Sequence, residues 1–289
     1  MHSCPICQRN KVTKIYNETL IECRNCSHIW ADLSLDEEQM RNIYAENYFK
    51  GEEYADYLAD KLILQTNFKN RLNYLKKLQS PPKFENVLEV GCAYGFFGEL
   101  MLEKKSKYKG YDISEDAIEY ANKQFGNNFS AQNYLLAEQP IEKYSDVFMW
   151  DVIEHLPNPS DFIKKISNET SINSRCYITT GDISTWLPRI QKDKWRMIHP
   201  PTHIHYFTNK SISNLLKQNG FKVEKISYPP VSRSFRVIFY SLFILNKNPG
   251  KIVTWFYNLI PEKASIQINT RDIMFVVGKK IIISIFIIH

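Results

Sequence analysis

The sequence of 289 residues lacks an apolar run long enough to cross a bilayer, which takes about 20 consecutive apolar residues. It also lacks an apolar segment next to Met1, so we expect no secretory signal there. A strong excess of one charge is missing too, since the net charge of +6 is spread along the chain. With 44% hydrophobic and 24% charged residues, the composition predicts a cytoplasmic protein with one large core and a small appendage. Peripheral membrane contact stays open.

Cysteine is scarce, but four of the six cysteines fall within the first thirty residues as two C-x-x-C pairs. Two such pairs offer four thiolates, which complete a tetrahedral zinc sphere and leave no position for catalysis. The alternative is a reducible disulfide pair or free thiols, which a chain without a secretion signal favours less. We therefore predict a structural zinc ribbon with the ligands Cys4, Cys7, Cys23 and Cys26. Cys92 and Cys176 are expected to be small buried residues.

An apolar strand at 87–90 breaks into a glycine turn and leads directly into a helix. Gly91 and Gly95 let the backbone pass close to a ligand, and the N–H groups at the start of the helix face it. Asp112 ends the next apolar segment, about twenty residues further on, which is the separation at which an acid binds a ribose. The pattern predicts a nucleotide pocket.

The spacing of the turn distinguishes between two ligands. A dinucleotide site requires G-x-G-x-x-G, whereas this chain reads Glu89-x-Gly91-x-x-x-Gly95, with Ala93 at the middle position. An acid before the turn repels phosphate but suits a ligand that carries an ammonium group and a sulfonium. The pattern favours S-adenosylmethionine over NAD.

With these motifs the chain resembles the class I S-adenosylmethionine-dependent methyltransferases, in particular the branch related to ubiquinone-biosynthesis O-methyltransferases. Residues 146–156 resemble the fourth strand of that family and the segment after it, and residues 200–208 resemble its histidine-bearing loop. The resemblance extends roughly from Phe84 to Val277. It implies an α/β fold with a Rossmann-like, doubly wound sheet and N-terminal helices over the cleft.

Four segments follow from these patterns. We expect a zinc ribbon in residues 1–33, a helical lid or linker in 34–82, a Rossmann-like methyltransferase domain in 83–280 with an insertion at 229–262, and an apolar tail in 281–289. Within the main domain we predict a helix at 114–124 and strands near 129 and at 146–150, 175–180, 221–227 and 272–277.

The ends of these strands carry the predicted cofactor site, because ligands of doubly wound sheets bind at the carboxyl ends of the strands. The residues are Glu89, Gly91, Cys92, Ala93, Gly95, Asp112, Ile113, Asn133 and Asp151. Asn133 belongs to this set because the adenine contact of such enzymes comes from the third strand and its loop.

The segment Asp151-Val152-Ile153-Glu154-His155 brings two acids and a histidine together if it turns helically, and His203 or His205 completes the cluster. Glu154, His155 and His203 are the predicted catalytic residues. Three roles remain open. Similar segments bind a divalent metal in some ubiquinone-pathway and small-RNA methyltransferases, although Asp151 is shorter than the Glu more common there. Otherwise a histidine acts as a general base, or both histidines only orient the loop.

Three further segments have alternative interpretations. Residues 34–37 form a capping-box pattern, and the rings after it either pack a helix onto the sheet or cover the cleft. Residues 181–207 combine rings with cations, which suits a sugar, a phosphorylated carrier or a nucleotide, or else form an ordered surface loop. Residues 232–260 fit two amphipathic helices that pack, line the cleft, form a dimer face or lie on a membrane.

The favoured function is O-methylation of a small molecule or a sugar, and family analogy suggests surface-glycan or natural-product biosynthesis. One alternative is an RNA methyltransferase whose ribbon and basic residues hold nucleic acid, although no strong nucleic-acid signal is present. A second alternative is a non-catalytic zinc-ribbon adaptor. The acceptor and the oligomeric state stay open.

Overall fold

The computed structural model describes residues 3–16, 18–33, 39, 57–78, 80–243, 250–261 and 264–282. The predicted capping box at 34–37 and most of the apolar tail at 281–289 lie outside these residues. So do four of the predicted lid rings, namely Tyr44, Tyr48, Phe49 and Tyr54.

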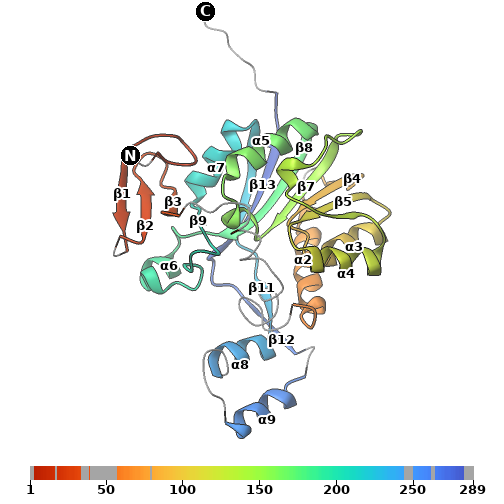
Figure 1. The fold of residues 1–289 in the computed structure, drawn as a ribbon, viewed down its shortest axis with the longest axis vertical. Coiled ribbons are helices and arrows are strands. Elements are labelled where there is room, and N and C mark those ends of the chain that lie inside the picture. Colours follow the sequence, from red (N-terminus) through yellow and green to blue (C-terminus); the bar gives the residue numbers. More distant parts are fainter. Residues whose placement is uncertain are drawn as a thin grey trace, which may run out of the picture.

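A seven-stranded sheet forms the centre of the molecule (Figure 1), in the order β10-β13-β8-β7-β4-β5-β6. Its strands in chain order are β4 (Asn86–Val90), β5 (Lys107–Asp112), β6 (Phe129–Ala131), β7 (Tyr144–Trp150), β8 (Thr170–Gly181), β10 (Phe221–Ser227) and β13 (Ile273–Lys280). The strands β4 to β8 pair in parallel, and β13 is antiparallel to both of its neighbours. The predicted Rossmann-like, doubly wound sheet is confirmed.

Helices cover both faces of the sheet, because alternate side chains of the central strands enter two apolar clusters. In β7, Val147 and Met149 pack toward α5 (Pro159–Glu169) and α7 (Asn209–Gln218). Phe148 and Trp150 of the same strand pack on the other face. That second face is covered by α2 (Lys61–Leu75), α3 (Phe96–Glu103) and α4 (Glu115–Phe125).

The N-terminal segment folds as a small antiparallel sheet of β1 (Val12–Ile15), β2 (Leu20–Cys23) and β3 (Ile29–Ala31). A fourth strand, β9 (His205–Tyr206), comes from the second half of the chain and pairs with β3. Figure 1 shows this small sheet beside the main one. The predicted ribbon is therefore hydrogen-bonded to the loop that carries His203.

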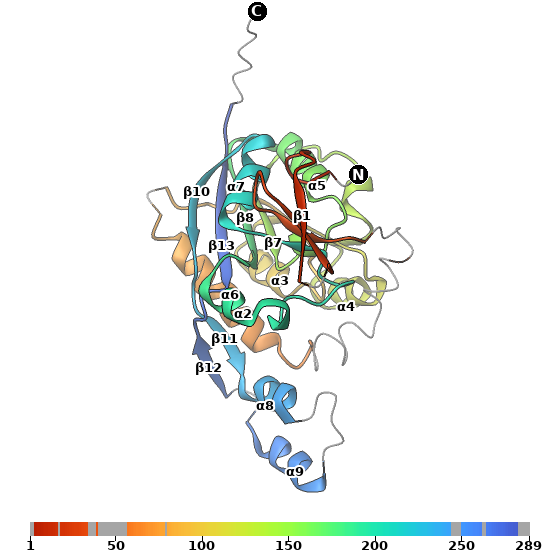
Figure 2. The ribbon, with the colours of Figure 1, turned by 90° about the vertical axis from the view of Figure 1, so that its left-hand side faces the viewer.

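The predicted insertion forms an arm that extends away from the main sheet in two perpendicular views (Figures 1 and 2). Its base is a two-stranded sheet of β11 (Val231–Ser234) and β12 (Ser265–Ile268), and its end consists of α8 (Phe235–Phe243) and α9 (Lys251–Leu259). The side chain of Asn67 in α2 binds both the N–H and the C=O of Ser232, at 2.7 and 2.9 Å. The base of the arm is thereby fixed to α2.

No helix among the described residues is long and apolar enough to span a membrane.

Candidate cofactor and catalytic site

The glycine turn follows β4 and has the backbone that only glycine adopts easily. Gly91 and Gly95 have φ angles of +76° and +75°. A Cβ at Gly91 would lie 2.3 Å from Cγ2 of Val152, and one at Gly95 would lie 2.7 Å from the ring of Phe129. The turn thus packs directly on the segment 151–155 that follows β7.

Asp112 stands at the end of β5 and faces the turn. Its Oδ2 accepts a hydrogen bond from the N–H of Ala93 at 2.8 Å, and its Oδ1 accepts one from Ser114 at 3.0 Å. These two amides fix the orientation of the carboxylate. Since each carboxylate oxygen has a second lone pair, the group can still accept hydrogen bonds from a vicinal diol.

Glu89 lies under the turn and is only 2% exposed. Burial raises the pKa of its carboxyl to about 8, although a hydrogen bond from the Tyr108 hydroxyl opposes that rise. At neutral pH the group is therefore mostly protonated. A ligand ammonium at this position would favour the carboxylate form.

Arg71 of α2 is a buried cation that sequence reasoning missed. It is 6% exposed, and its guanidinium carbon lies 5.3 Å from the ring centroid of Trp150. Burial lowers the pKa of Arg71, and the nearby Asp151 partly offsets this. In the sequence, Arg71 stands on the same face of the helix as the apolar residues Phe68 and Leu72, and this position could have indicated that its side chain is buried.

The predicted catalytic residues come together. One potential ligand atom from each of Glu154, His155 and His203 lies within 4.8 Å of the others, and all three residues are buried. Glu154 and His155 lie in a single 3₁₀ turn after β7, Ile153–His155. The rings of His155 and His203 have centroids 4.5 Å apart.

Backbone carbonyls orient both rings. Nδ1 of His155 lies 2.8 Å from the oxygen of Thr202, and Nδ1 of His203 lies 2.9 Å from the oxygen of Met197. A carbonyl only accepts, so each Nδ1 carries the proton and each Nε2 carries the lone pair. Burial lowers the pKa of His155 to about 4 and that of His203 well below its usual value. Both imidazoles are neutral at pH 7.

Asp151 does not join this cluster, so the proposed four-residue metal set reduces to three residues. Its backbone has φ +55°, and its N–H donates to Oγ1 of Thr179 at 2.9 Å. The negative charge of Asp151 instead raises the pKa values of Arg71 and His155, although burial outweighs this effect in both.

The other predicted cofactor residues lie around the turn. Cys92 is buried, and Ile113 directly follows Asp112. Asn133 lies in the loop after β6, where its Oδ1 accepts a hydrogen bond from Leu135 at 3.0 Å. That bond leaves the side-chain NH₂ of Asn133 available as a donor.

The geometry of the four N-terminal cysteines fits a metal better than disulfides. The Sγ atoms of Cys4 and Cys26 lie 3.5 Å apart, as do those of Cys7 and Cys23, and all four lie within 4.8 Å of one another. A disulfide would require about 2.05 Å. Tetrahedral zinc with bonds of about 2.3 Å places its sulfur atoms roughly 3.8 Å apart.

The cysteine cluster is connected to the histidine cluster through backbone contacts. The N–H of Ala31 in β3 donates to the oxygen of Ile204, and the N–H of Ile204 donates to the oxygen of Glu154. Beside them, Nε2 of the fully buried His28 lies 3.0 Å from Nδ1 of His205. The ribbon thus contacts Ile204 and His205, and Ile204 in turn binds the turn that carries Glu154.

Residues 53–226, more than half of the chain, match the methyltransferase-domain family. The chain belongs to that family, and its fold is that of the class I S-adenosylmethionine-dependent methyltransferases.

Among curated proteins it is similar to two ubiquinone biosynthesis O-methyltransferases. That of Hydrogenovibrio crunogenus is 27% identical over 182 residues, covering 58% of this chain and 75% of the relative. That of Coxiella burnetii is 24% identical over 115 residues, covering 38% of this chain. The match spans about half, 49%, of the Coxiella protein.

Two solved structures share the fold. Magnesium protoporphyrin IX methyltransferase from Synechocystis, with bound S-adenosylhomocysteine, has a TM-score of 0.53 at 15% identity, covering 85% of this chain and 100% of that one. An S-adenosylmethionine-dependent methyltransferase from Archaeoglobus fulgidus has a TM-score of 0.51 at 18% identity, covering 81% and 97%.

The cysteine geometry generates the first prediction. Cys23→Ser should remove the bound zinc, because three thiolates hold the ion more weakly than four, and it should unfold the ribbon. Metal analysis of the purified chain measures this directly. Cys176→Ala, a buried cysteine in β8, is the matched control and should retain one zinc per chain. One zinc per chain in the Cys23 variant would contradict the four-thiolate site.

Proposed function

We propose that this methyltransferase transfers the methyl group of S-adenosylmethionine to a hydroxyl group of a small molecule or a sugar. The observation that carries the proposal is the position of the cluster of Glu154, His155 and His203. Glu154 and His155 follow β7 on a segment that packs, through Val152, against the glycine turn, and His203 joins them from the loop before β9. The similarity to ubiquinone biosynthesis O-methyltransferases supports an oxygen acceptor.

In the cofactor site that we propose, a polar or charged side chain contacts each polar group of S-adenosylmethionine. Asp112 accepts hydrogen bonds from the ribose, and the loop around Asn133 contacts the adenine. Glu89 receives the ammonium group of the methionine part. Arg71, a buried cation beside Trp150, receives its carboxylate. The glycine turn, with Cys92 and Ala93, passes under the ligand. Its shape requires Gly91 and Gly95, because a side chain at either would clash with Val152 or Phe129.

The sulfonium is already activated, so the protein mainly aligns the acceptor oxygen with the methyl group and excludes water. As the carbon–oxygen bond forms, the carbon–sulfur bond breaks and its electron pair stays on the sulfur as a neutral thioether. The hydroxyl proton passes to Nε2 of His155 or His203, where the lone pair lies.

The same three residues also fit a divalent cation, which is the second candidate mechanism. Two imidazoles with their protons fixed on Nδ1, together with a carboxylate, form a usual catalytic ligand set. A cation held there would lower the pKa of the acceptor hydroxyl.

The ribose contact can be tested by ligand binding. Asp112→Ala should weaken binding of both S-adenosylhomocysteine and 5′-methylthioadenosine by about 10- to 100-fold, because both ligands carry the diol. Titration calorimetry measures both affinities. Asp116→Ala, a neighbouring acid in the first turn of α4, is the control. Unchanged affinity in the Asp112 variant would exclude the ribose contact.

The Glu89 site predicts a pH dependence. The carboxyl of the free protein has a pKa of about 8, and an ammonium group beside it lowers that value, so the complex holds fewer protons. The affinity for S-adenosylhomocysteine should therefore rise with pH between about 5.5 and 7.5. Glu89→Gln should abolish most of this rise, and 5′-methylthioadenosine, which lacks the ammonium group, should show little of it. A flat profile in the unmodified protein would contradict the assignment.

The reaction itself can be tested with methyl-labelled S-adenosylmethionine and separated fractions of metabolites with nucleotide sugars, glycans with lipids, and RNA. We expect label in a metabolite or glycan fraction, and at least a hundredfold slower labelling with His155→Ala. Label in RNA only would replace the proposed acceptor class. Absence of label despite cofactor binding would favour the adaptor interpretation.

The same assay distinguishes between the two mechanisms. A chelator that leaves the ribbon zinc in place, verified by metal analysis, should not slow a reaction that uses a histidine base. Loss of activity that added Mg²⁺ or Mn²⁺ restores would identify the metal mechanism instead.

A further inference from the structure

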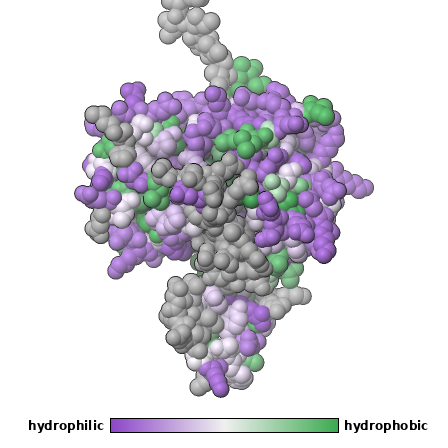
Figure 3. Space-filling view, in the orientation of Figure 1, coloured by the Kyte–Doolittle hydropathy of each residue, from purple (hydrophilic) through white to green (hydrophobic). Residues whose placement is uncertain are grey.

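His28 lies at the junction between the ribbon and the loop of residues 192–208, here called the histidine loop because it carries His203. His28 directly precedes β3 and is fully buried. Hydrophilic residues dominate the face of the main body that Figure 3 shows, where water can satisfy their polar groups. The two ring nitrogens of His28 have no such access, so their partners must come from the protein.

The hydrogen bonds of the neighbouring His205 give the direction of its contact with His28. Nε2 of His205 lies 3.5 Å from the oxygen of Pro157, and a carbonyl only accepts, so this Nε2 carries the proton. Burial lowers the pKa of His205 to about 4, so the ring is neutral at pH 7 and its Nδ1 bears the lone pair. Nε2 of His28, at 3.0 Å, therefore donates its N–H to that Nδ1.

Nδ1 of His28 has no hydrogen-bond partner within the part of the chain that the structure describes. Burial, together with the nearby His205, lowers the pKa of His28 well below its usual value, so this nitrogen bears only a lone pair. A buried acceptor without a partner lowers stability, and an apolar side chain of similar size would avoid that loss. Packing alone therefore does not account for a histidine here, whereas the N–H that reaches His205 does.

The backbone of His28 is held by the cysteine cluster. Its carbonyl oxygen accepts a hydrogen bond from the N–H of Cys23 at 2.8 Å. At the other end of the contact, Pro157 follows two residues after His155, the last residue of the 3₁₀ turn with the predicted catalytic residues. A series of contacts thus connects the cysteines, through two imidazoles, to a carbonyl beside that turn.

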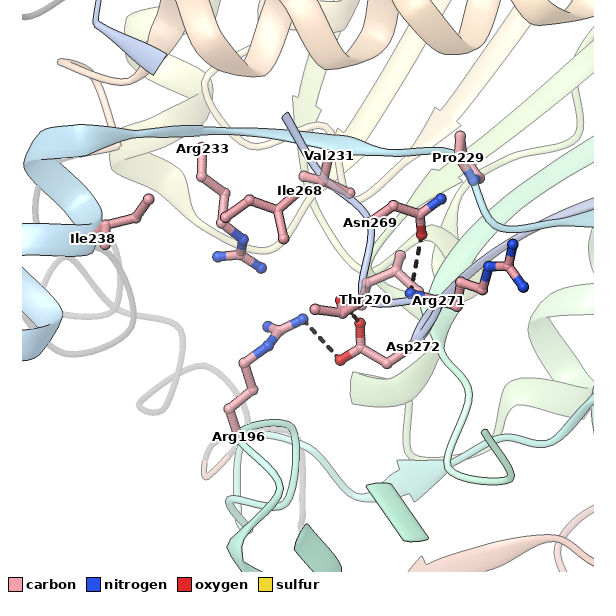
Figure 4. Close-up of a pocket in the computed structure, with 11 residues that line it drawn as sticks. Arg196, Pro229, Val231, Arg233, Ile238, Ile268, Asn269, Thr270, Arg271 and Asp272 are labelled. Carbon is pink, nitrogen blue, oxygen red and sulfur yellow. Dashed lines mark hydrogen bonds and ion pairs between the residues drawn. The ribbon is translucent and has the colours of Figure 1, made fainter. Parts of the chain in front are cut away.

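A second side-chain contact holds the histidine loop on the main sheet. Asp272, fully buried just before β13, accepts hydrogen bonds from Nε1 of Trp195 at 3.0 Å and from Arg196 at 3.3 Å. The close-up in Figure 4 shows Arg196 reaching Asp272 from the loop. Met197 follows directly, and its carbonyl oxygen receives the Nδ1 proton of His203. Along the chain, His203 therefore lies between two anchors, one on the main sheet and one on the ribbon.

We propose that His28 is a positioning residue of the candidate catalytic centre, which holds the histidine loop against the turn at Ile153–His155 through His205. This inference rests on the proposed function, because it assigns His28 a role in the transfer step at that centre. His28 acts only through His205. Loss of its N–H should loosen the lone pair of His203 relative to that of His155, without changing the glycine turn.

The experiment compares His28→Leu, which removes the N–H, with His28→Gln, whose side-chain amide can donate to the same Nδ1. Methyl transfer from labelled S-adenosylmethionine, to the fraction that the unmodified chain labels, should have a kcat lower by about tenfold or more in His28→Leu. In His28→Gln it should recover to within about threefold of the unmodified rate. The KM for S-adenosylmethionine and the zinc content should stay unchanged in both variants.

Lys210→Gln is the matched control. It removes a different contact between the ribbon and the main domain, in which Nζ of Lys210 donates to the oxygen of Asn25 at 2.7 Å. Because this contact does not involve the histidine loop, the rate should not change.

Nitrogen NMR of isotope-labelled histidine rings provides a readout that needs no acceptor. In the unmodified chain, His205 should carry its proton on Nε2 and His203 should carry its proton on Nδ1. His28→Leu should admit the other tautomer of His203, and His28→Gln should restore the original pattern.

A proton on Nδ1 of His205 in the unmodified chain would reverse the donor and overturn the proposal, whether or not a variant folds. So would an unmodified rate in His28→Leu, or an equal loss of rate in His28→Leu and His28→Gln. Loss of zinc or of S-adenosylhomocysteine affinity in His28→Leu would show a general structural role and overturn it as well. If the unmodified chain labels no fraction, the proposed function fails, and the ring tautomers still decide the role of His28.

Discussion

The pairing of β3 with β9 is the contact on which the catalytic side of this molecule depends. It joins the first thirty residues to a loop about 175 residues later, at Ile29 with Tyr206 and Trp30 with His205. The loop between α6 (Trp186–Gln191) and α7 has little regular structure of its own, so its backbone needs partners from elsewhere. The ribbon supplies them. A zinc ion bound by the four cysteines would therefore stabilise β3, the strand that pairs with the histidine loop.

The cofactor side is organised by buried charge. Glu89 and Arg71 are both buried, and burial shifts each pKa toward the neutral form. Each group is therefore destabilised in the free protein and gains from an opposite charge. A methionine moiety carries an ammonium and a carboxylate, so one ligand can satisfy both groups. The pyrophosphate of NAD could pair with Arg71, but it would repel the carboxylate of Glu89. The acid before the glycine turn favours S-adenosylmethionine over NAD for the same reason.

Local sequence patterns predicted the sheet, because apolar strand segments, a glycine turn and an acid at a strand end are local features. The predicted helix at 114–124 is confirmed as α4, whose N-cap Ser114 accepts a hydrogen bond from Ala117. The sequence could not show that Asp151 lies apart from the histidine cluster, since its left-handed backbone depends on packing after β7. Nor could it show β3 beside β9, because two short segments of this kind carry no pairing signal. Arg71 was missed because a cation on a helix usually faces solvent.

The histidine cluster raises a chemical difficulty that the reaction itself resolves. With a pKa of about 4, His155 is too weak a base to deprotonate a free hydroxyl before methyl transfer. As the methyl group reaches the oxygen, however, the hydroxyl becomes an oxonium and its proton becomes strongly acidic. A weak base is then sufficient, provided that its lone pair already points at the oxygen. In the proposed reaction, the carbonyls of Thr202 and Met197 fix the two imidazole rings, so the fold would supply alignment where it does not supply basicity.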